Sequence, residues 1–84
     1  MARAHDAVLE FSFDDERRAR IVEHSVRPEV GEIAGDRTTA TLDREAATVT
    51  VTVASDDLVA LRAGINTWST LVSVGERAGA AATR

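Results

Sequence analysis

The chain has 84 residues, no cysteine and a formal net charge of −4. A chain of this length builds one domain at most, and the lack of cysteine excludes disulfides, thiolate metal sites and thiol catalysis. With 44% hydrophobic residues, the composition is that of a globular protein. Because no apolar run has the length of a membrane span or the placement of a signal peptide, we expect a cytoplasmic protein with no membrane contact.

The charged residues have an unusual makeup, because all ten basic residues are arginine and fourteen acidic residues oppose them. An excess of carboxylates together with the absence of lysine is typical of high-salt cytoplasms and indicates a halophile. A high-GC codon bias would also replace lysine by arginine, and the composition alone leaves both origins open. In either case, the net negative charge disfavours independent binding of nucleic acid.

The first half of the chain predicts a strand followed by a helix. Apolar and polar residues alternate over residues 5–13, which indicates a strand with one buried face. Asp14 and Asp15 offer an N-cap for a helix that runs to about Val26, since the following Pro28 disfavours helical geometry. The solvated side of this helix is expected to carry its charged residues: Glu16, Arg17, Arg18, Arg20 and Glu23.

Two further strands are predicted at about residues 37–43 and 48–53, and the second of them alternates threonine and valine without error. Residues 44–46 between these strands lack the Asn-Gly signature of a two-residue hairpin. We therefore expect a longer connecting loop.

A second helix closes the predicted fold. Ser55 or Asp56 is expected to cap it, and it runs to about Val74. The Gly/Ala-rich residues 75–84 then form a frayed tail. This leaves an ordered core over about residues 5–74 within a single domain that spans the whole chain.

The element order β-α-β-β-α predicts an α+β fold. A helical crossover gives the first two strands the same direction, so the third strand fits between them and is antiparallel to both. Both helices then cover one face of a three-stranded antiparallel sheet, in a two-layer sandwich. The expected core consists of Ala7, Leu9, Phe11, Phe13, Val22, Val26, Leu42, Val49, Val51, Val53, Leu58, Leu61, Ile65 and Trp68.

The second helix is unusually poor in charge. Residues 58–75 contain one charged residue, Arg62, although 29% of the chain is charged. A stripe from Leu58 to Val72 at intervals of three and four is enough to cover the sheet. The remaining neutral circumference predicts a contact with another chain, and the alternative is that small uncharged residues simply face water.

A second surface without charge is expected on the outer face of the sheet. Threonine suits a solvent-facing strand, which is the simpler interpretation. The alternative is association of this face or its edge with a second copy, to give a two-fold dimer. The threonines concerned are Thr39, Thr41, Thr48, Thr50 and Thr52.

The sequence offers no catalytic or metal-binding motif. His5 and His24 lack partners at ligand spacing, and the carboxylates at 14–16 and 56–57 coincide with the expected helix starts. No glycine-rich loop carries the Lys and Ser/Thr of a phosphate-binding loop, and no serine lies in a nucleophile elbow. We therefore expect neither an enzyme nor a bound cofactor or metal.

Two segments carry recognisable motifs. Residues 21–29 form an apolar helix end with the pattern Ser-x-x-Pro-Glu, and Asp36-Arg37 follow. Residues 54–68 follow the pattern Ala-x-Asp-Leu-x-Ala-Leu-Arg-Ala-x-x-Asn, with departures at Asp56 and Gly64. Over about residues 5–74, the chain resembles the small dimerising subunit of the KEOPS complex, the polarised-growth chromatin-associated controller family, in its archaeal and haloarchaeal form.

The resemblance implies a non-catalytic subunit of the machinery that makes threonylcarbamoyladenosine in tRNA. In that family two copies dimerise, and each docks helical surface against the N-terminal lobe of the metal-bearing catalytic subunit. Arg37 and Arg62 are candidate tRNA contacts within the assembled complex. The alternative function is a stand-alone small α/β RNA-binding module. By position, the motif gives docking and fold-defining roles to Leu58, Leu61, Arg62, Ile65, Asn66 and Trp68, and the neutral side of the helix adds Ala63 and Thr70.

Overall fold

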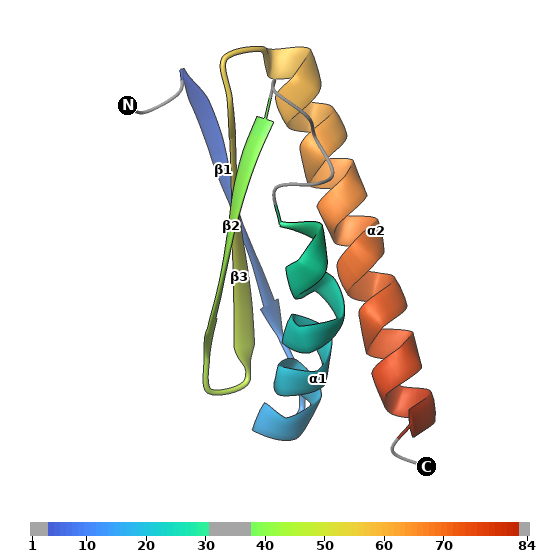
Figure 1. Cartoon of the computed structure of the whole chain (residues 1–84). Coiled ribbons are helices and arrows are strands. Elements are labelled where there is room, and N and C mark those ends of the chain that lie inside the picture. The colour runs from blue at the N-terminus through green and yellow to red at the C-terminus, as the bar shows by residue number, and fades with distance from the viewer. Residues whose placement is uncertain (1–3, 31–37, 83–84) are drawn as a thin grey trace.

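The computed structural model describes residues 4–30 and 38–82, with side chains up to Arg77. These residues form a three-stranded antiparallel sheet with two helices on one of its faces (Figure 1). This is the α+β fold predicted from the sequence. The elements in chain order are β1 (His5–Ser12), α1 (Glu16–Val26), the 3-10 turn η1 (Arg27–Glu29), β2 (Thr38–Glu45), β3 (Thr48–Ser55) and α2 (Leu58–Ala82).

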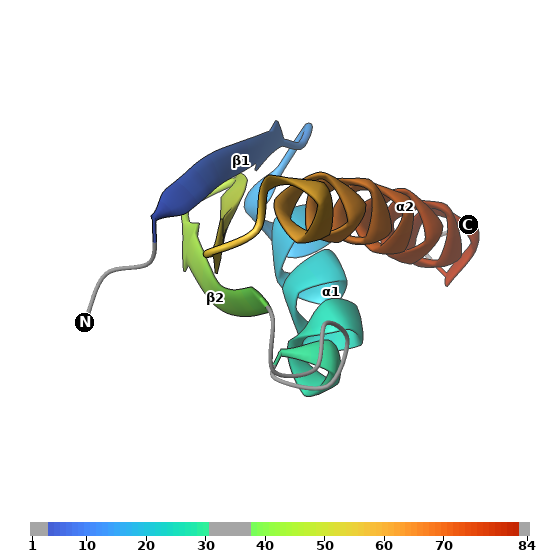
Figure 2. The same ribbon diagram turned by 90° about the horizontal axis from the view of Figure 1, so that it is seen from above.

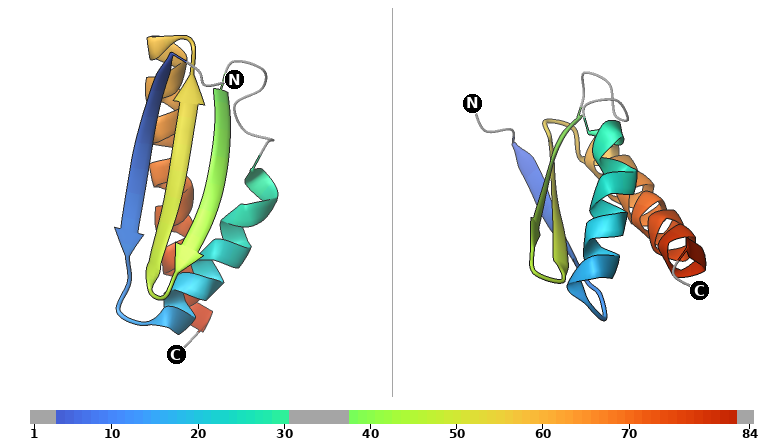
Figure 3. Two further views of the ribbon diagram at one scale, coloured as in Figure 1. Left: turned by 90° about the vertical axis from the view of Figure 1, so that its left-hand side faces the viewer. Right: turned by 60° about the horizontal axis from the view of Figure 1, so that its bottom comes forward.

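The strand order is β1-β3-β2, so β3 lies in the middle and is antiparallel to both neighbours, as predicted (Figure 3). All three strands have eight residues and pair along their full length. The strict alternation of β3 buries Val49, Val51 and Val53 completely, at 0% exposure. The valines of the central strand therefore form the centre of the hydrophobic core.

Both helices pack on the same face of the sheet and against each other (Figure 2). Asp15 is the N-cap of α1, and its Oδ1 accepts a hydrogen bond from the Arg18 N–H at 2.8 Å. At the other end, Pro28 lies within η1, which terminates the helix. The buried hydrophobic side chains are Ala19, Val22, Val26, Val49, Val51, Val53, Leu61, Trp68 and Val72.

The core differs from the expected one at the start of α2. Leu58 was expected to be buried but is 56% exposed, because the buried stripe of the helix begins one turn later, at Leu61. Val72, the end of the stripe expected to cover the sheet, is buried, and Ala19 also belongs to the core. Phe13 lies beyond the end of β1 and is half-buried.

The loop between β2 and β3 is shorter than expected, because Glu45 pairs with Thr48 and leaves a two-residue turn, Ala46–Ala47. Ala46 has a φ of 53°, a left-handed conformation that usually selects Gly or Asn. Two hydrogen bonds hold the turn nonetheless. Arg44 Nη1 donates to the Ala46 carbonyl at 3.1 Å, and the Phe13 N–H donates to the Ala47 carbonyl at 2.9 Å.

The cap of α2 is Asp57 rather than Ser55 or Asp56. Asp57 Oδ1 accepts a hydrogen bond from the Val59 N–H at 2.9 Å, and the Asp57 carbonyl accepts from the Leu61 N–H at 2.9 Å. Ser55 still contributes, since its Oγ accepts from the Asp57 N–H at 3.2 Å. The hydroxyl thus orders the residue that caps the helix.

Helix α2 continues to Ala82 instead of ending at Val74 before a frayed tail. Gly75 is not a helix stop but a packing position, where a Cβ would lie 3.6 Å from Ser25 Cβ and 3.6 Å from Val22 Cγ1 on α1. The residues that follow are rich in alanine, the strongest helix former. The contact with α1 and this propensity together extend the helix.

Gly64 marks the closest approach of α2 to the sheet. A Cβ at this position would lie 3.0 Å from Val53 Cγ1 and 3.3 Å from Thr38 Cγ2. Both distances are shorter than ordinary van der Waals contact, so a larger residue would push the helix away from β3 and β2.

Gly64 and Gly75 of α2 make opposite predictions for stability. Gly64→Ala should lower the free energy of unfolding by about 1–2 kcal/mol, because the overpacking cost exceeds the gain in helix propensity. Gly75→Ala is the matched control and should raise it by about 0.5–1 kcal/mol, since its new methyl group meets only ordinary contacts. Urea denaturation measures both, and a Gly64→Ala protein as stable as the parent would contradict the packing described here.

Candidate interaction surfaces

The side of α2 that faces away from the sheet is a nearly neutral strip. We name it the α2 strip and define it as Val59, Ala63, Asn66, Thr70, Ser73 and Arg77, all of which are exposed. These residues follow one another at intervals of 4-3-4-3-4, the spacing of a helix seam that packs along a second helix. Arg62 and Val74 flank the strip, and Val59 is 77% exposed.

The residues expected to dock a partner divide between the two sides of α2. Arg62, Ala63, Asn66 and Thr70 are exposed together on or beside the α2 strip, with Leu58 also exposed at the start of the helix. Ile65 is half-buried. The remaining two face the chain's own core, since Leu61 is 6% and Trp68 is 1% exposed.

Val59 and Val74, which belong to the neutral side of the helix expected to meet another chain, and Ser73 are exposed next to the predicted docking residues but were not among them. The heptad-like spacing of the neutral residues was the signal that could have found them. Of the two candidate RNA contacts, Arg62 is exposed on α2, and Arg37 lies outside the described residues.

The outer face of the sheet is acidic, not free of charge as expected. We name it the sheet face; the predicted threonines lie on it, with Thr39 and Thr41 exposed and the three threonines of β3 half-buried. Four carboxylates flank β3 from the two outer strands, and no described residue of the face is basic. The sheet face consists of Asp6, Val8, Glu10, Ser12, Thr39, Thr41, Asp43, Glu45, Thr48, Thr50, Thr52 and Ala54.

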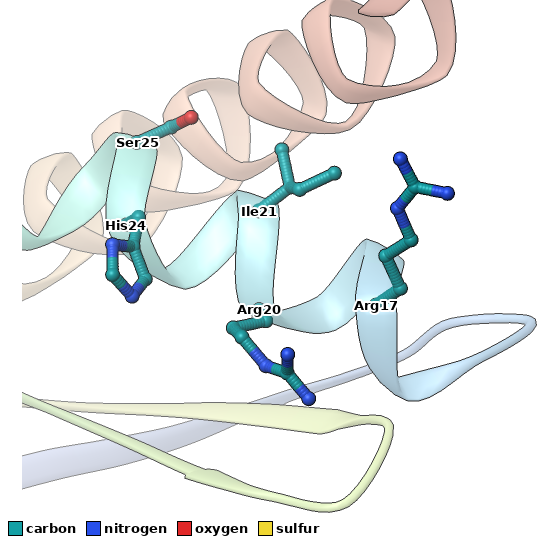
Figure 4. Close-up of a pocket in the computed structure, with 5 residues that line it drawn as sticks. All are labelled: Arg17, Arg20, Ile21, His24 and Ser25. Atoms are coloured by element: carbon teal, nitrogen blue, oxygen red, sulfur yellow. The ribbon is translucent and has the colours of Figure 1, made fainter. Parts of the chain in front are cut away.

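A hollow lies on the surface of α1, and Figure 4 shows five residues that line it. The described lining residues all come from this one helix: Arg17, Arg20, Ile21, His24 and Ser25. Ile21 and Ser25 point toward α2, whereas Arg20 and His24 point the other way (Figure 4). Side chains that diverge in this way do not converge on a small ligand, so the hollow does not have the geometry of a cofactor site.

The described residues contain no group of three or more His, Asp or Glu side chains that could hold a metal ion. His5 on β1 and His24 on α1 are both exposed and lie on different elements. In residues 4–30 and 38–82, no helix has the length and hydropathy needed to cross a membrane.

The surfaces alone do not show to which protein family the chain belongs, and a comparison with family models does. The model described as "Transcription factor Pcc1" matches residues 6–78, a stretch that runs from β1 into the last turns of α2. The chain belongs to the Pcc1 family. This is a family of KEOPS-associated subunits, so the resemblance found in the sequence is confirmed at the level of the family. Comparison with curated proteins gives no match.

In this Pcc1-family chain, a charged cluster joins α1 to the end of the β2–β3 hairpin. Arg44 Nε donates to Glu23 Oε1 at 2.6 Å, and Arg27 donates to the other carboxylate oxygen of Glu23. Arg44 Nη1 also lies 3.5 Å from Glu16 Oε2. Because Arg44 belongs to β2, the cluster fixes the helix to the strand.

Glu23 was expected on the solvated side of α1 but is 9% exposed. It lies in the same stripe as Ala19, Val22 and Val26, at intervals of three and four, and this stripe is buried between the sheet and α2. The place of Glu23 in this stripe therefore predicts that its carboxylate is buried. A buried carboxylate needs cationic partners, because its charge is costly to remove from water.

The two arginines hold the pKa of Glu23 below its ordinary value of 4.5. The hydrogen bond from Arg44 is the largest cause, and it outweighs burial, which acts in the opposite direction. The hydrogen bond to Glu23 likewise raises the pKa of Arg44. The cluster is therefore ionised at neutral pH and acts as a structural tie between α1 and β2.

Replacing Glu23 should change stability in a pH-dependent way. At pH 7, Glu23→Gln should lower the free energy of unfolding by about 1–3 kcal/mol, because the charge-assisted hydrogen bonds are lost. The folded pKa lies below the unfolded one, so this stabilisation exists above pH 4.5 and disappears as the pH falls through the folded pKa. The difference between parent and variant should therefore shrink below pH 4.5 in urea titrations.

Glu76→Gln is the control for this measurement, because Glu76 is exposed on α2 and away from the cluster. It should change stability by less than about 0.5 kcal/mol at any pH. A difference between the parent protein and Glu23→Gln that stays constant from pH 7 to pH 3 would contradict the ion pairing assigned to Glu23.

Proposed function

We propose that this chain is a non-catalytic, dimerising scaffold subunit of a KEOPS complex, and that it docks to the catalytic subunit that makes threonylcarbamoyladenosine in tRNA. The observation that carries the proposal is the α2 strip. A helix whose inner side already covers the sheet presents a second, neutral side with helix-packing spacing. Membership in the Pcc1 family supports the complex that is named.

The α2 strip suits a helical partner. Its residues are small or medium in size, so a second helix can approach closely and pack its side chains between them. In this proposal, as the resemblance implies, the surface that the α2 strip contacts belongs to the N-terminal lobe of the catalytic subunit. The docking residues in this proposal are the exposed ones: Leu58, Val59, Arg62, Ala63, Asn66, Thr70, Ser73 and Val74.

Dimerisation is proposed to use the sheet face, which lies on the opposite side of the molecule from both helices (Figures 2 and 3). Two copies joined through this face leave both α2 strips free on the outside. One dimer can then dock two catalytic subunits at once. Arg62, together with Arg37, remains a proposed tRNA contact in this assembly, which we place in the cytoplasm of a haloarchaeon.

The acidic sheet face disfavours the alternative of a stand-alone RNA-binding module. Small α/β domains of that kind commonly bind RNA through the open face of the sheet. Here that face carries four carboxylates and no described basic residue, and it would repel a phosphate backbone.

The docking proposal predicts that a charge on the α2 strip prevents binding to the catalytic subunit. Ala63→Glu or Thr70→Glu should weaken the complex at least about 100-fold, because an unpaired carboxylate buried in an interface costs about 3 kcal/mol or more. Thr41→Glu places the same charge on the sheet face and should leave this affinity unchanged. Calorimetric titration with the purified catalytic subunit measures all three, and equal binding by the Ala63→Glu protein would refute the assignment.

The dimer proposal predicts the reverse pattern for self-association. Light scattering at micromolar concentration in concentrated KCl should give the mass of two chains for the parent and for Ala63→Glu. Thr41→Glu should give the mass of one chain, because it would bury an unpaired carboxylate in the middle of the shared face, where the cost of removing it from water remains in concentrated salt. A parent protein that is monomeric under these conditions would show that the sheet face does not join two copies.

A further inference from the structure

The sheet face has an ordered distribution of charge, which the strand register defines. Thr41, Thr52 and Val8 face one another across the three strands and form a neutral middle row, in which Val8 is 59% exposed. The neighbouring row contains Asp43, Thr50 and Glu10, with a carboxylate on each side of a threonine. Asp6 and Glu45 add one carboxylate to each of the two end rows.

These carboxylates have no cationic partner among the described residues. The ion pairs within residues 4–30 and 38–77 involve the carboxylates of α1 and of the residue before its cap, together with Arg18, Arg20, Arg27 and Arg44. Arg44 is the only arginine on a described strand, and its side chain reaches Glu23 and Glu16 on the helix side of the sheet. The negative charge of the sheet face is therefore uncompensated within this part of the chain.

A two-fold contact through this face brings the same charges together from both copies. In such an interface each protomer contributes the same surface, so four carboxylates of one copy face four of the other. Packed sheets lie about 10 Å apart, a distance that exceeds the Debye length of about 3 Å at 1 M salt but not that of about 10 Å at 0.1 M. The repulsion across the interface acts at low ionic strength and is screened at high ionic strength.

We infer that self-association through the sheet face is controlled by salt: the dimer is weak at low ionic strength and tightens as salt screens its facing carboxylates. This inference rests on the proposed dimer and adds the condition under which it forms. The sign is opposite to that of an interface held by ion pairs, which salt weakens. The neutral middle row supplies the attractive contact, and the four surrounding carboxylates determine the salt concentration that the dimer needs in order to form.

The test measures the dimer dissociation constant by sedimentation equilibrium at pH 7 between 0.1 and 2 M KCl. For the parent protein, the dissociation constant should fall at least about tenfold over this range. The double variant Glu10→Gln/Asp43→Asn removes two carboxylates of the sheet face and should dimerise already at 0.1 M KCl, with a much smaller dependence on salt. Circular dichroism at each KCl concentration verifies that the chain is folded.

The matched control is Asp14→Asn/Glu76→Gln, which removes the same number of charges from exposed positions outside the sheet face. It should retain the salt dependence of the parent. A parent dimer whose dissociation constant does not change with KCl, or a control that loses the dependence as fully as the sheet-face variant, would overturn the inference while leaving the dimer intact. If parent and double variant are both monomeric at every KCl concentration, the proposed dimer fails instead.

Discussion

The close contact between α2 and the central strand is the constraint on which the rest of the structure depends. Gly64 lets the helix backbone lie almost directly on Val53, and Leu61, Trp68 and Val72 then fill the space over the sheet. Because β3 is paired on both edges and covered on one face, the other elements are positioned relative to it. This contact also determines which residues of α2 remain on the outside.

The molecule separates its charges into three regions of different character. The cluster around Glu23 is fully paired, with Glu23 itself buried and its arginine partners partly exposed, and it holds α1 to the hairpin. The α2 strip is almost neutral, and the sheet face is acidic without described counter-charges. The paired cluster stabilises the chain itself, whereas the neutral strip and the uncompensated face are the surfaces that the proposed docking and dimerisation use. The proposed scaffold role follows from this division.

Much of the fold could be predicted from local patterns. The alternation of threonine and valine located β3, and the shared direction that a helical crossover gives to the first two strands left room for β3 between them, which is the order that the structure has. The errors arose where tertiary contacts override propensity. Gly75 was interpreted as a helix end but serves helix packing, and Ala46 adopts a left-handed turn that its residue type does not favour. Glu23 was assigned to solvent although its position required burial.

The candidate surfaces were predictable only in part, since a sequence motif does not separate residues that shape the helix from residues that face outward. Leu61 and Trp68 belong to the first kind and Asn66 to the second. One further consequence concerns mechanics. At Gly75 the backbones of the two helices approach closely, and Arg44 ties the first of them to the hairpin. A force applied along the outside of α2 is therefore passed on to α1 and to the sheet, a property that suits the proposed role of holding two catalytic subunits apart.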